Sequence, residues 1–248
     1  MRVGKTDYGK AECSGEGVIW GCLLLIRKYK KDFTMKKLFL SSYFSGVASL
    51  FPAFTNNICS GKKIVFIPTA SNIEKVTFYV DADKKTLGKL DLIIDELDIS
   101  NTSYDEISTK ISCADYVFVE GGNTFFLLQE LRKSGADNLI VEHINKGKIY
   151  IGASAGSMIL SKDIEYVKYM DNPNAAPDLN GNFTALSVVD FCIIPHFTNF
   201  PFKKSAEKIV KEYSSKLDLR AISNNQAIIV NGDAIKMITD ESKKKTAN

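Results

Sequence analysis

The residues best suited to catalysis form the run Gly152-Ala153-Ser154-Ala155-Gly156, which follows the apolar segment KIYI and precedes the apolar residues 158–160. The pattern G-x-S-x-G between a strand and a helix is typical of a nucleophile elbow, in which the two glycines permit a strained turn that exposes the serine hydroxyl. The backbone N–H of Ala155 would then face a developing oxyanion. We therefore predict that Ser154 is a nucleophile; the alternative is a tight structural turn.

A serine nucleophile needs a general base, and the sequence contains two histidines. His143 lies in a predicted helix near the amino end of strand 148–152, whereas the elbow lies at the carboxyl end, about five residues or roughly 16 Å away. We therefore expect His143 to be a partly exposed helix residue. His196 follows the predicted strand 188–194 and should lie at the same carboxyl edge as the elbow. We expect His196 to be the base; the alternative is a buried loop histidine.

A glycine pair follows a third strand, in the run Glu120-Gly121-Gly122-Asn123-Thr124-Phe125. Glycines at such a position let the backbone approach a ligand, and their N–H groups are candidates for a second oxyanion donor. A phosphate-binding loop is a weaker interpretation, because neither GxGxxG nor GxxxxGK[ST] is present. The run also suits a simple glycine turn in which Asn123 or Thr124 caps the next helix.

The elements that must position these residues are short apolar runs without alternation, which favour strands covered on both faces, separated by amphipathic stretches. We predict strands at residues 37–41, 63–67, part of 91–99, 115–119, 148–152, 188–194 and 226–230. We predict helices at about residues 74–87, 124–133, 137–145, 154–161 and 203–216. This order predicts a doubly wound, mostly parallel α/β sheet, whose chemistry gathers at the carboxyl ends of its strands. Residues 227–238 around Asn231-Gly232 predict a C-terminal hairpin.

Composition places the 248 residues in the globular class, with 45% hydrophobic and 25% charged residues. The net charge of +3 comes from residues 1–34, so the body is neutral and a nucleic-acid partner is not expected. The five cysteines lie far apart without a CxxC spacing, which argues against structural zinc and favours a reducing compartment.

The first 34 residues differ from the rest in pattern. Their apolar stretch, residues 18–26, is too short for a membrane span, which needs about 20 residues. We expect the domain to cover residues 35–238, with residues 1–34 as an appendage or a misplaced start and residues 239–248 as a polar tail. The alternative for the first segment is a weak interfacial anchor.

The segments GGNTFFLL, KIYIGASAGSMIL and IIPHFTN, together with KKLFLSSYF and KIVFIPTAS, resemble the peptidase E family, the serine aspartyl dipeptidases related to cyanophycinase. The resemblance covers roughly residues 35–238. It implies a three-layer, doubly wound sheet of the class I glutamine-amidotransferase-like (flavodoxin-like) type, with Ser154 where those enzymes carry cysteine. It also implies that His196 is the base and that Gly122 and Ala155 donate to the oxyanion.

The resemblance places Asn224 where relatives carry the acid of the catalytic triad. An amide oxygen can accept from the histidine N–H and fix its tautomer, but it brings no charge. Asp171 matches a second acidic position of the family, where it would bind the substrate's amino group or assist the histidine; the alternative is a solvated turn aspartate. Gly121, Asn123 and Thr124 are expected to line the substrate site.

The loop at residues 200–204 lacks the arginine with which the aspartyl dipeptidases hold an acidic side chain. Lys203 or Lys204 would offer only a point charge, so strict cleavage after an N-terminal aspartate is not expected.

These features predict acyl transfer from short peptides to water without a metal or cofactor, in the cytoplasm, with a peptide as partner and neither nucleic acid nor membrane. A homodimer is an open option. Two other classes stay open: a catalytically weak or inactive relative that acts as a binding or sensor domain, and a different hydrolase on the same scaffold, such as an esterase, an amidase or a cyanophycin-type peptidase.

Overall fold

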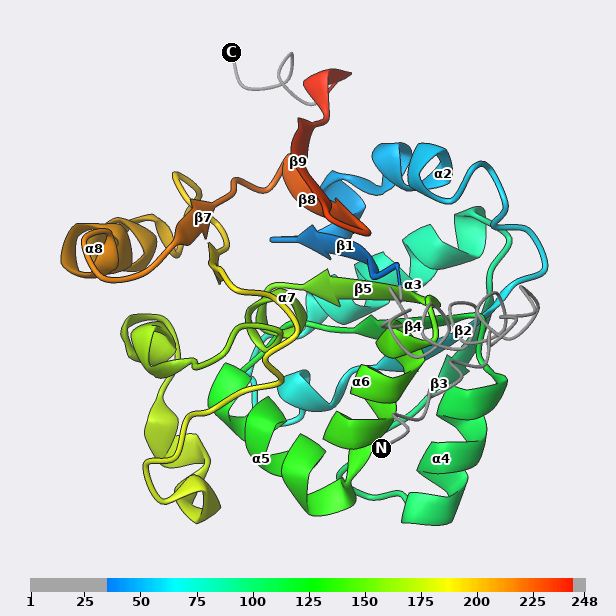
Figure 1. The fold of residues 1–248 in the computed structure, drawn as a ribbon, viewed down its shortest axis with the longest axis horizontal. Coiled ribbons are helices and arrows are strands. Elements are labelled where there is room, and N and C mark those ends of the chain that lie inside the picture. Colours follow the sequence, from blue (N-terminus) through cyan, green and yellow to red (C-terminus); the bar gives the residue numbers. More distant parts are fainter. Residues whose placement is uncertain (1–34, 243–248) are drawn as a thin grey trace, which may run out of the picture. The chain divides into compact units, whose positions relative to one another are not determined.

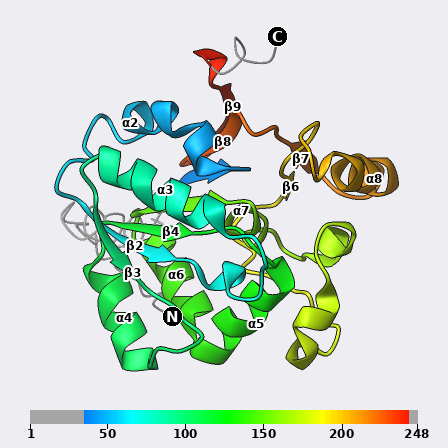
Figure 2. The same cartoon turned by 180° about the vertical axis from the view of Figure 1, so that it is seen from behind.

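The computed structural model describes residues 35–242, which form a central sheet of seven strands in the order β3-β2-β4-β5-β1-β8-β9 (Figures 1 and 2). The strands are β1 (Lys37–Ser41), β2 (Lys63–Ile67), β3 (Ile93–Glu96), β4 (Tyr116–Val119), β5 (Ile149–Ala153), β8 (Gln226–Asn231) and β9 (Ala234–Thr239). The first five are parallel, whereas β8 is antiparallel to β1 and β9 to β8. The predicted fold class and the C-terminal hairpin are therefore confirmed.

Helices cover both faces of this sheet. The helices are α2 (Phe51–Phe54), α3 (Phe78–Lys89), α4 (Tyr104–Cys113), α5 (Thr124–Ser134), α6 (Ala136–Asn145), α7 (Ala155–Met158) and α8 (Lys203–Tyr213). Figures 1 and 2 show α2 and α3 on one side of the sheet and α4, α5 and α6 on the other. The molecule thus has the three layers expected of a doubly wound α/β domain.

Alternate residues of each inner strand enter two separate cores. In β2, Ile64 and Phe66 pack with α3, whereas Val65 and Ile67 pack with the helices of the opposite layer. Successive side chains of a strand point to opposite faces, and both faces are covered here, so every second position does not need to be polar. For this reason the inner strands do not alternate polar and apolar residues in the sequence.

A separate parallel pair, β6 (Cys192–Ile194) with β7 (Leu219–Ala221), lies beside α8 and outside the main sheet (Figure 1). Residues 188–194 were expected to form one strand of the main sheet, and that expectation is wrong. The N–H groups of Val188 and Val189 donate to Leu160 O instead of to a strand. β7 was not predicted, because it has only three residues and its side chains are half-exposed or exposed, so it lacks the apolar run of a buried strand.

Other differences concern element ends. α3 begins at Phe78 rather than near residue 74, because residues 72–78 are exposed. α4 was not predicted, although Ser103 caps it by accepting from the N–H of Glu106. Asp240, placed by the sequence in a polar tail, is buried and its carboxylate accepts from Ser49 Oγ at 2.6 Å. The expectations for residues 1–34 and for residues 243–248 lie outside the described residues.

Candidate active site

Ser154 occupies a strained turn between β5 and α7, with φ 47° and ψ −105°. A positive φ is unfavourable for any residue with a Cβ, and such strain persists only where the surroundings enforce it. The two flanking glycines let the surrounding backbone come close enough to hold Ser154 in this conformation. A Cβ on Gly156 would lie 2.0 Å from Val119 O, and one on Gly152 would lie 2.6 Å from Gly156 O. The turn therefore requires glycine at both positions, as the sequence pattern suggested.

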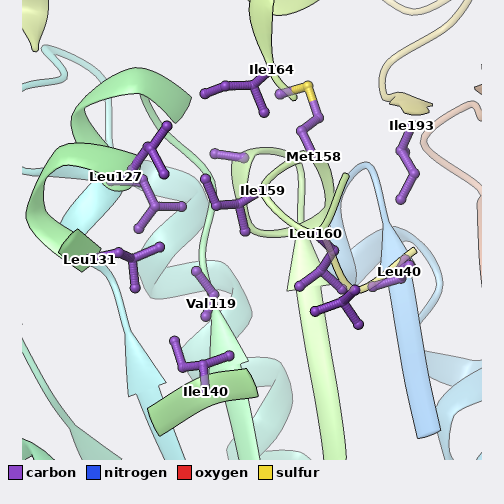
Figure 3. Packing of buried hydrophobic residues seen from close by; sticks show 14 of the residues in the cluster. Leu40, Val119, Leu127, Leu131, Ile140, Met158, Ile159, Leu160, Ile164 and Ile193 are labelled. Carbon is purple, nitrogen blue, oxygen red and sulfur yellow. The ribbon is translucent and has the colours of Figure 1, made fainter. Parts of the chain in front are cut away.

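The short helix after Ser154 is anchored in the larger core. Figure 3 shows Met158, Ile159 and Leu160 packed among Leu127 of α5, Val119 of β4 and the neighbouring apolar side chains, and all three are fully buried or nearly so. Burial of three large apolar side chains fixes the direction in which α7 leaves the turn. The elbow is therefore held from behind by packing.

A hydrogen-bonded chain joins Ser154, His196 and Asn224. His196 Nε2 lies 3.1 Å from Ser154 Oγ, and His196 Nδ1 lies 2.7 Å from Asn224 Oδ1. An amide oxygen only accepts, so Nδ1 carries the proton and Nε2 is left free to accept from the serine hydroxyl. This is the tautomer that a general base requires.

His196 is placed by contacts that join distant segments. Its backbone is left-handed, with φ 58°, and its N–H donates to Ser42 Oγ at 3.0 Å. Ser42 Oγ also lies 3.0 Å from the carbonyl of Ile222. Phe202 stacks on the imidazole with ring centroids 4.9 Å apart. Sequence reasoning did not single out Ser42; its place directly after β1, at a carboxyl strand end, was the available signal.

Asn224 is fixed through its backbone. Its N–H donates to Asn199 Oδ1 at 2.8 Å. Its carbonyl lies against Gly46, where a Cβ would come within 2.1 Å of the oxygen. These backbone contacts hold Asn224 in place, and its side-chain oxygen accepts from His196.

Burial lowers the pKa of His196 below its usual value, and the bond from Asn224 opposes the effect in part. Removing the imidazolium from water is costly, and an uncharged acceptor returns little of that cost. The imidazole is therefore neutral at neutral pH and able to accept a proton.

The glycine loop lies directly against the serine. A Cβ on Gly121 would be 3.2 Å from Ser154 Cβ, and one on Gly122, with φ 138°, would be 2.1 Å from Ala70 O. Within the described part of the chain, no group accepts from the N–H of Gly122 or of Ala155. Two unengaged N–H groups in the segments next to the nucleophile are candidates for an oxyanion hole.

Asp171 caps α5 rather than assisting the histidine. Its Oδ2 accepts from Thr124 N–H at 2.8 Å and from Thr124 Oγ1 at 2.6 Å, while both ring nitrogens of His196 are engaged elsewhere. Burial raises the pKa of Asp171 to about 6, and the Thr124 bonds oppose the rise. Asn123 binds the same segment, since its Nδ2 donates to Asn172 O at 3.2 Å, and its Oδ1 accepts from Phe126 N–H.

The loop beyond the histidine exposes Phe200 and its two lysines, whereas Phe202 is half-buried against His196. Phe200 is 92% exposed, and Lys203 and Lys204 are exposed at the start of α8. Lys203 lies 3.9 Å from Glu207 on its own helix.

His143 differs from expectation in one respect. It is only 2% exposed, not partly exposed, and its Nε2 bonds to Ile149 O at 3.0 Å. That contact places it at the first residue of β5, the end opposite the elbow. The expectation that it cannot serve Ser154 agrees with this position.

Among residues 35–242 no group of three or more His, Cys, Asp or Glu side chains could hold a metal ion. Over the same residues, no helix is long and apolar enough to cross a membrane.

Comparison with known proteins identifies the family. Residues 37–238 match the model of peptidase family S51. The chain belongs to that family. It is 50% identical over 201 residues to an uncharacterized peptidase of Listeria innocua, covering 81% of this chain and 95% of the relative. It is 34% identical over 175 residues to peptidase E of Shewanella sp. strain MR-4, covering 67% and 69% of the two chains.

Solved structures support the S51 fold. A crystal structure of a Listeria monocytogenes EGD-e protein, named as a candidate peptidase E, superposes with a TM-score of 0.80 at 48% identity. The match covers 84% of this chain and all of that one. The resemblance drawn from the sequence motifs is therefore confirmed, and the protein is a serine peptidase of the peptidase E family.

Proposed function

We propose that this S51 member hydrolyses short peptides through an acyl-enzyme on Ser154. The observation that carries the proposal is the continuous chain from Ser154 Oγ to His196 Nε2 and from His196 Nδ1 to Asn224 Oδ1. A hydroxyl on a strained turn, bonded to an oriented imidazole, is the arrangement that acyl transfer requires.

In this mechanism His196 takes the Ser154 proton as Oγ bonds to the peptide carbonyl carbon. The N–H groups of Gly122 and Ala155 then stabilise the oxyanion. As the C–N bond breaks, His196 gives its proton to the leaving amine. The same imidazole then deprotonates a water that attacks the acyl carbon, and the imidazolium returns this proton to Ser154 Oγ as the Oγ–acyl bond breaks.

The substrate site is proposed along Gly121, Asn123, Thr124 and Asp171. Asp171, with Glu74 close enough to raise its pKa further, makes this region anionic, which suits the free amino group of a short peptide. The loop at residues 200–204 offers no arginine to an acidic side chain. We therefore propose dipeptides and other short peptides as substrates without strict selection for N-terminal aspartate. A cytoplasmic location and a homodimer stay predictions.

Covalent labelling with a fluorophosphonate at neutral pH tests the proposal. We expect the wild type to be labelled and both Ser154→Ala and His196→Ala to lose labelling by at least about 100-fold while keeping the wild-type melting temperature. Labelling that survives in Ser154→Ala would overturn the assignment of the nucleophile.

A folded wild type that does not react would favour a binding or sensor domain, for which the uncharged Asn224 is the supporting feature. A labelled enzyme that cleaves esters or amides but no dipeptide would favour a different hydrolase on this scaffold. Assaying Asp-X dipeptides beside neutral and basic ones decides the selectivity.

A further inference from the structure

Two carboxyl groups that the mechanism does not use are buried together behind the active site. Asp83, on α3, is 0% exposed, and Glu120, directly after β4, is 1% exposed. Figure 2 shows α3 lying over the sheet near β4. The two carboxyl groups lie close enough that each changes the pKa of the other. Among the described residues neither carboxyl has a lysine, arginine or histidine partner.

Each carboxyl has one oxygen that faces a backbone donor and one that does not. Asp83 Oδ1 accepts from Ser45 N–H at 2.9 Å and from Ser45 Oγ. Glu120 Oε1 accepts from Gly121 N–H at 2.7 Å. Asp83 Oδ2 and Glu120 Oε2 are buried, and no N–H or hydroxyl donor in residues 35–242 reaches them. Two carboxylate oxygens cannot bond to one another unless one of them carries a proton.

The outer ends of the pair reach the two halves of the active site. Gly121, held by Glu120, packs on Ser154 and precedes the oxyanion donor Gly122. Ser45, held by Asp83, precedes Gly46, which packs on the carbonyl of Asn224. One residue, Gly121, thus separates the pair from the nucleophile, and two residues, Ser45 and Gly46, separate it from the histidine's acceptor.

We propose that Asp83 and Glu120 share a single proton and act as one positioning unit, which holds the glycine loop against Ser154 and residues 44–46 against Asn224. Loss of that proton at alkaline pH places two adjacent charges in an apolar interior, and repulsion between them displaces both loops. The consequence for turnover rests on the proposed function, whereas the shared proton does not.

The electrostatic surroundings favour the singly protonated state. Burial, followed by the charge of Asp83, raises the pKa of Glu120 well above its usual range, and burial also raises the pKa of Asp83. The titratable groups that face the pair are phenols: Tyr43, before residues 44–46, and Tyr79, on α3. Burial raises the pKa of each phenol, and the charges of Asp83 and Glu120 for Tyr43, and of Glu120 for Tyr79, raise it further, so both stay neutral. On α3, Lys84 is directed to Glu96, at 3.1 Å.

The amide of glutamine mimics the protonated carboxyl without titrating. In Glu120→Gln, the amide oxygen accepts from Gly121 N–H and the NH₂ group donates to Asp83. Asp83→Asn is the reciprocal mimic, donating to Glu120 while accepting from Ser45. Glu130→Gln is the matched control, because Glu130 is a buried glutamate on α5 that bonds to Gln129 and lies outside the pair.

The first test follows the backbone amides of Gly121 and Ser45 by ¹H–¹⁵N NMR from about pH 4 to about pH 10 in the full chain. In the wild type and in Glu130→Gln we expect both amides to shift with common midpoints, the later one at alkaline pH. In Glu120→Gln the alkaline step should vanish at both residues. Separate midpoints for the two amides, or no alkaline step in the wild type, would overturn the proposal.

The second test measures the fluorophosphonate labelling rate over the same pH range. We expect wild type and Glu130→Gln to fall about fivefold or more at alkaline pH, whereas Glu120→Gln and Asp83→Asn stay within about twofold of their neutral rates. A purely structural role predicts a changed melting temperature with an unchanged pH profile. Loss of labelling at neutral pH in both mimics also counts against the proposal. If the wild type does not label at all, the proposed function fails, and the amide titration still decides whether the proton is shared.

Discussion

At the scale of single residues, the imidazole of His196 bonds only to neutral groups. Its two ring nitrogens meet the hydroxyl of Ser154 and the amide of Asn224. The amide fixes the tautomer, but the imidazolium that forms during acyl transfer has no counter-charge beside it. The proposed enzyme therefore works with a weaker base than a triad that includes a carboxylate, since burial lowers the pKa of His196 and no neighbouring charge offsets that effect.

Asn224→Asp supplies that charge in a side chain of the same shape. The carboxylate should raise the pKa of His196, so the acid limb of labelling moves to higher pH. If one unit of pKa is gained, the plateau rate rises about tenfold, since one unit corresponds to about 1.4 kcal/mol. The pH–rate profile of fluorophosphonate labelling checks both effects. Asn225→Asp, one residue along the chain, is the control; an equal gain there would mean that general charge, not contact with His196, is responsible.

At the scale of elements, the strand–turn–helix around Ser154 depends on close backbone contact between β5, α7 and β4. Gly156 has no room for a Cβ because Val119 O lies where that atom would be, at 2.0 Å. Both elements are deeply packed and cannot separate without loss of core contacts. The geometry of the nucleophile is therefore a property of this packing.

Gly156→Ala should force α7 away from β4. We expect a loss of about 1–3 kcal/mol in the free energy of unfolding, the usual cost of overpacking, and loss of labelling because Ser154 moves relative to His196. Urea unfolding and labelling measure the two effects. Gly88→Ala in α3 is the control, since a Cβ there meets nothing within 4 Å; it should be neutral or stabilising by up to about 1 kcal/mol. Full labelling in Gly156→Ala would refute this account of the elbow.

At the scale of the whole molecule, buried titrating groups lie at the two ends of the parallel strands. His143 bonds to the first residue of β5, and Glu120 follows the last residue of β4, which runs beside β5 in the same direction. Burial lowers the pKa of His143 to about 4, while it raises the pKa of Glu120. The two groups therefore oppose one another in the pH dependence of stability.

The folded pKa of His143 lies below the ordinary 6.5, so as pH falls the unfolded chain takes up the proton first. Its contribution is present above about pH 6.5 and is lost as pH falls toward about 4, by about 3 kcal/mol in total. His143→Gln cannot titrate and should flatten this loss. Urea unfolding at several pH values between about 4 and 7 measures it. A variant that loses stability with acid as steeply as the wild type would refute the assignment to His143.

Prediction from sequence succeeded where a feature is local. The strands 37–41 and 63–67 agree with β1 and β2 at both ends, because their apolar runs are bounded by polar and turn residues. It was less accurate where an element depends on its neighbours. β6 and β7 form strands because they pair with one another. The spacing of apolar residues in either segment does not predict that pairing.

The sequence by itself determined the five parallel strands of the main sheet, the C-terminal hairpin and the elbow at Ser154, because periodicity and glycine spacing act within a few residues. Only the tertiary structure decided that Asn224, rather than Asp171, bonds to His196, and that Ser42 holds the histidine in place. Only the tertiary structure paired Asp83 with Glu120 as well. Each of these contacts joins segments that are distant in the chain, and the sheet brings them together by packing that no single segment encodes.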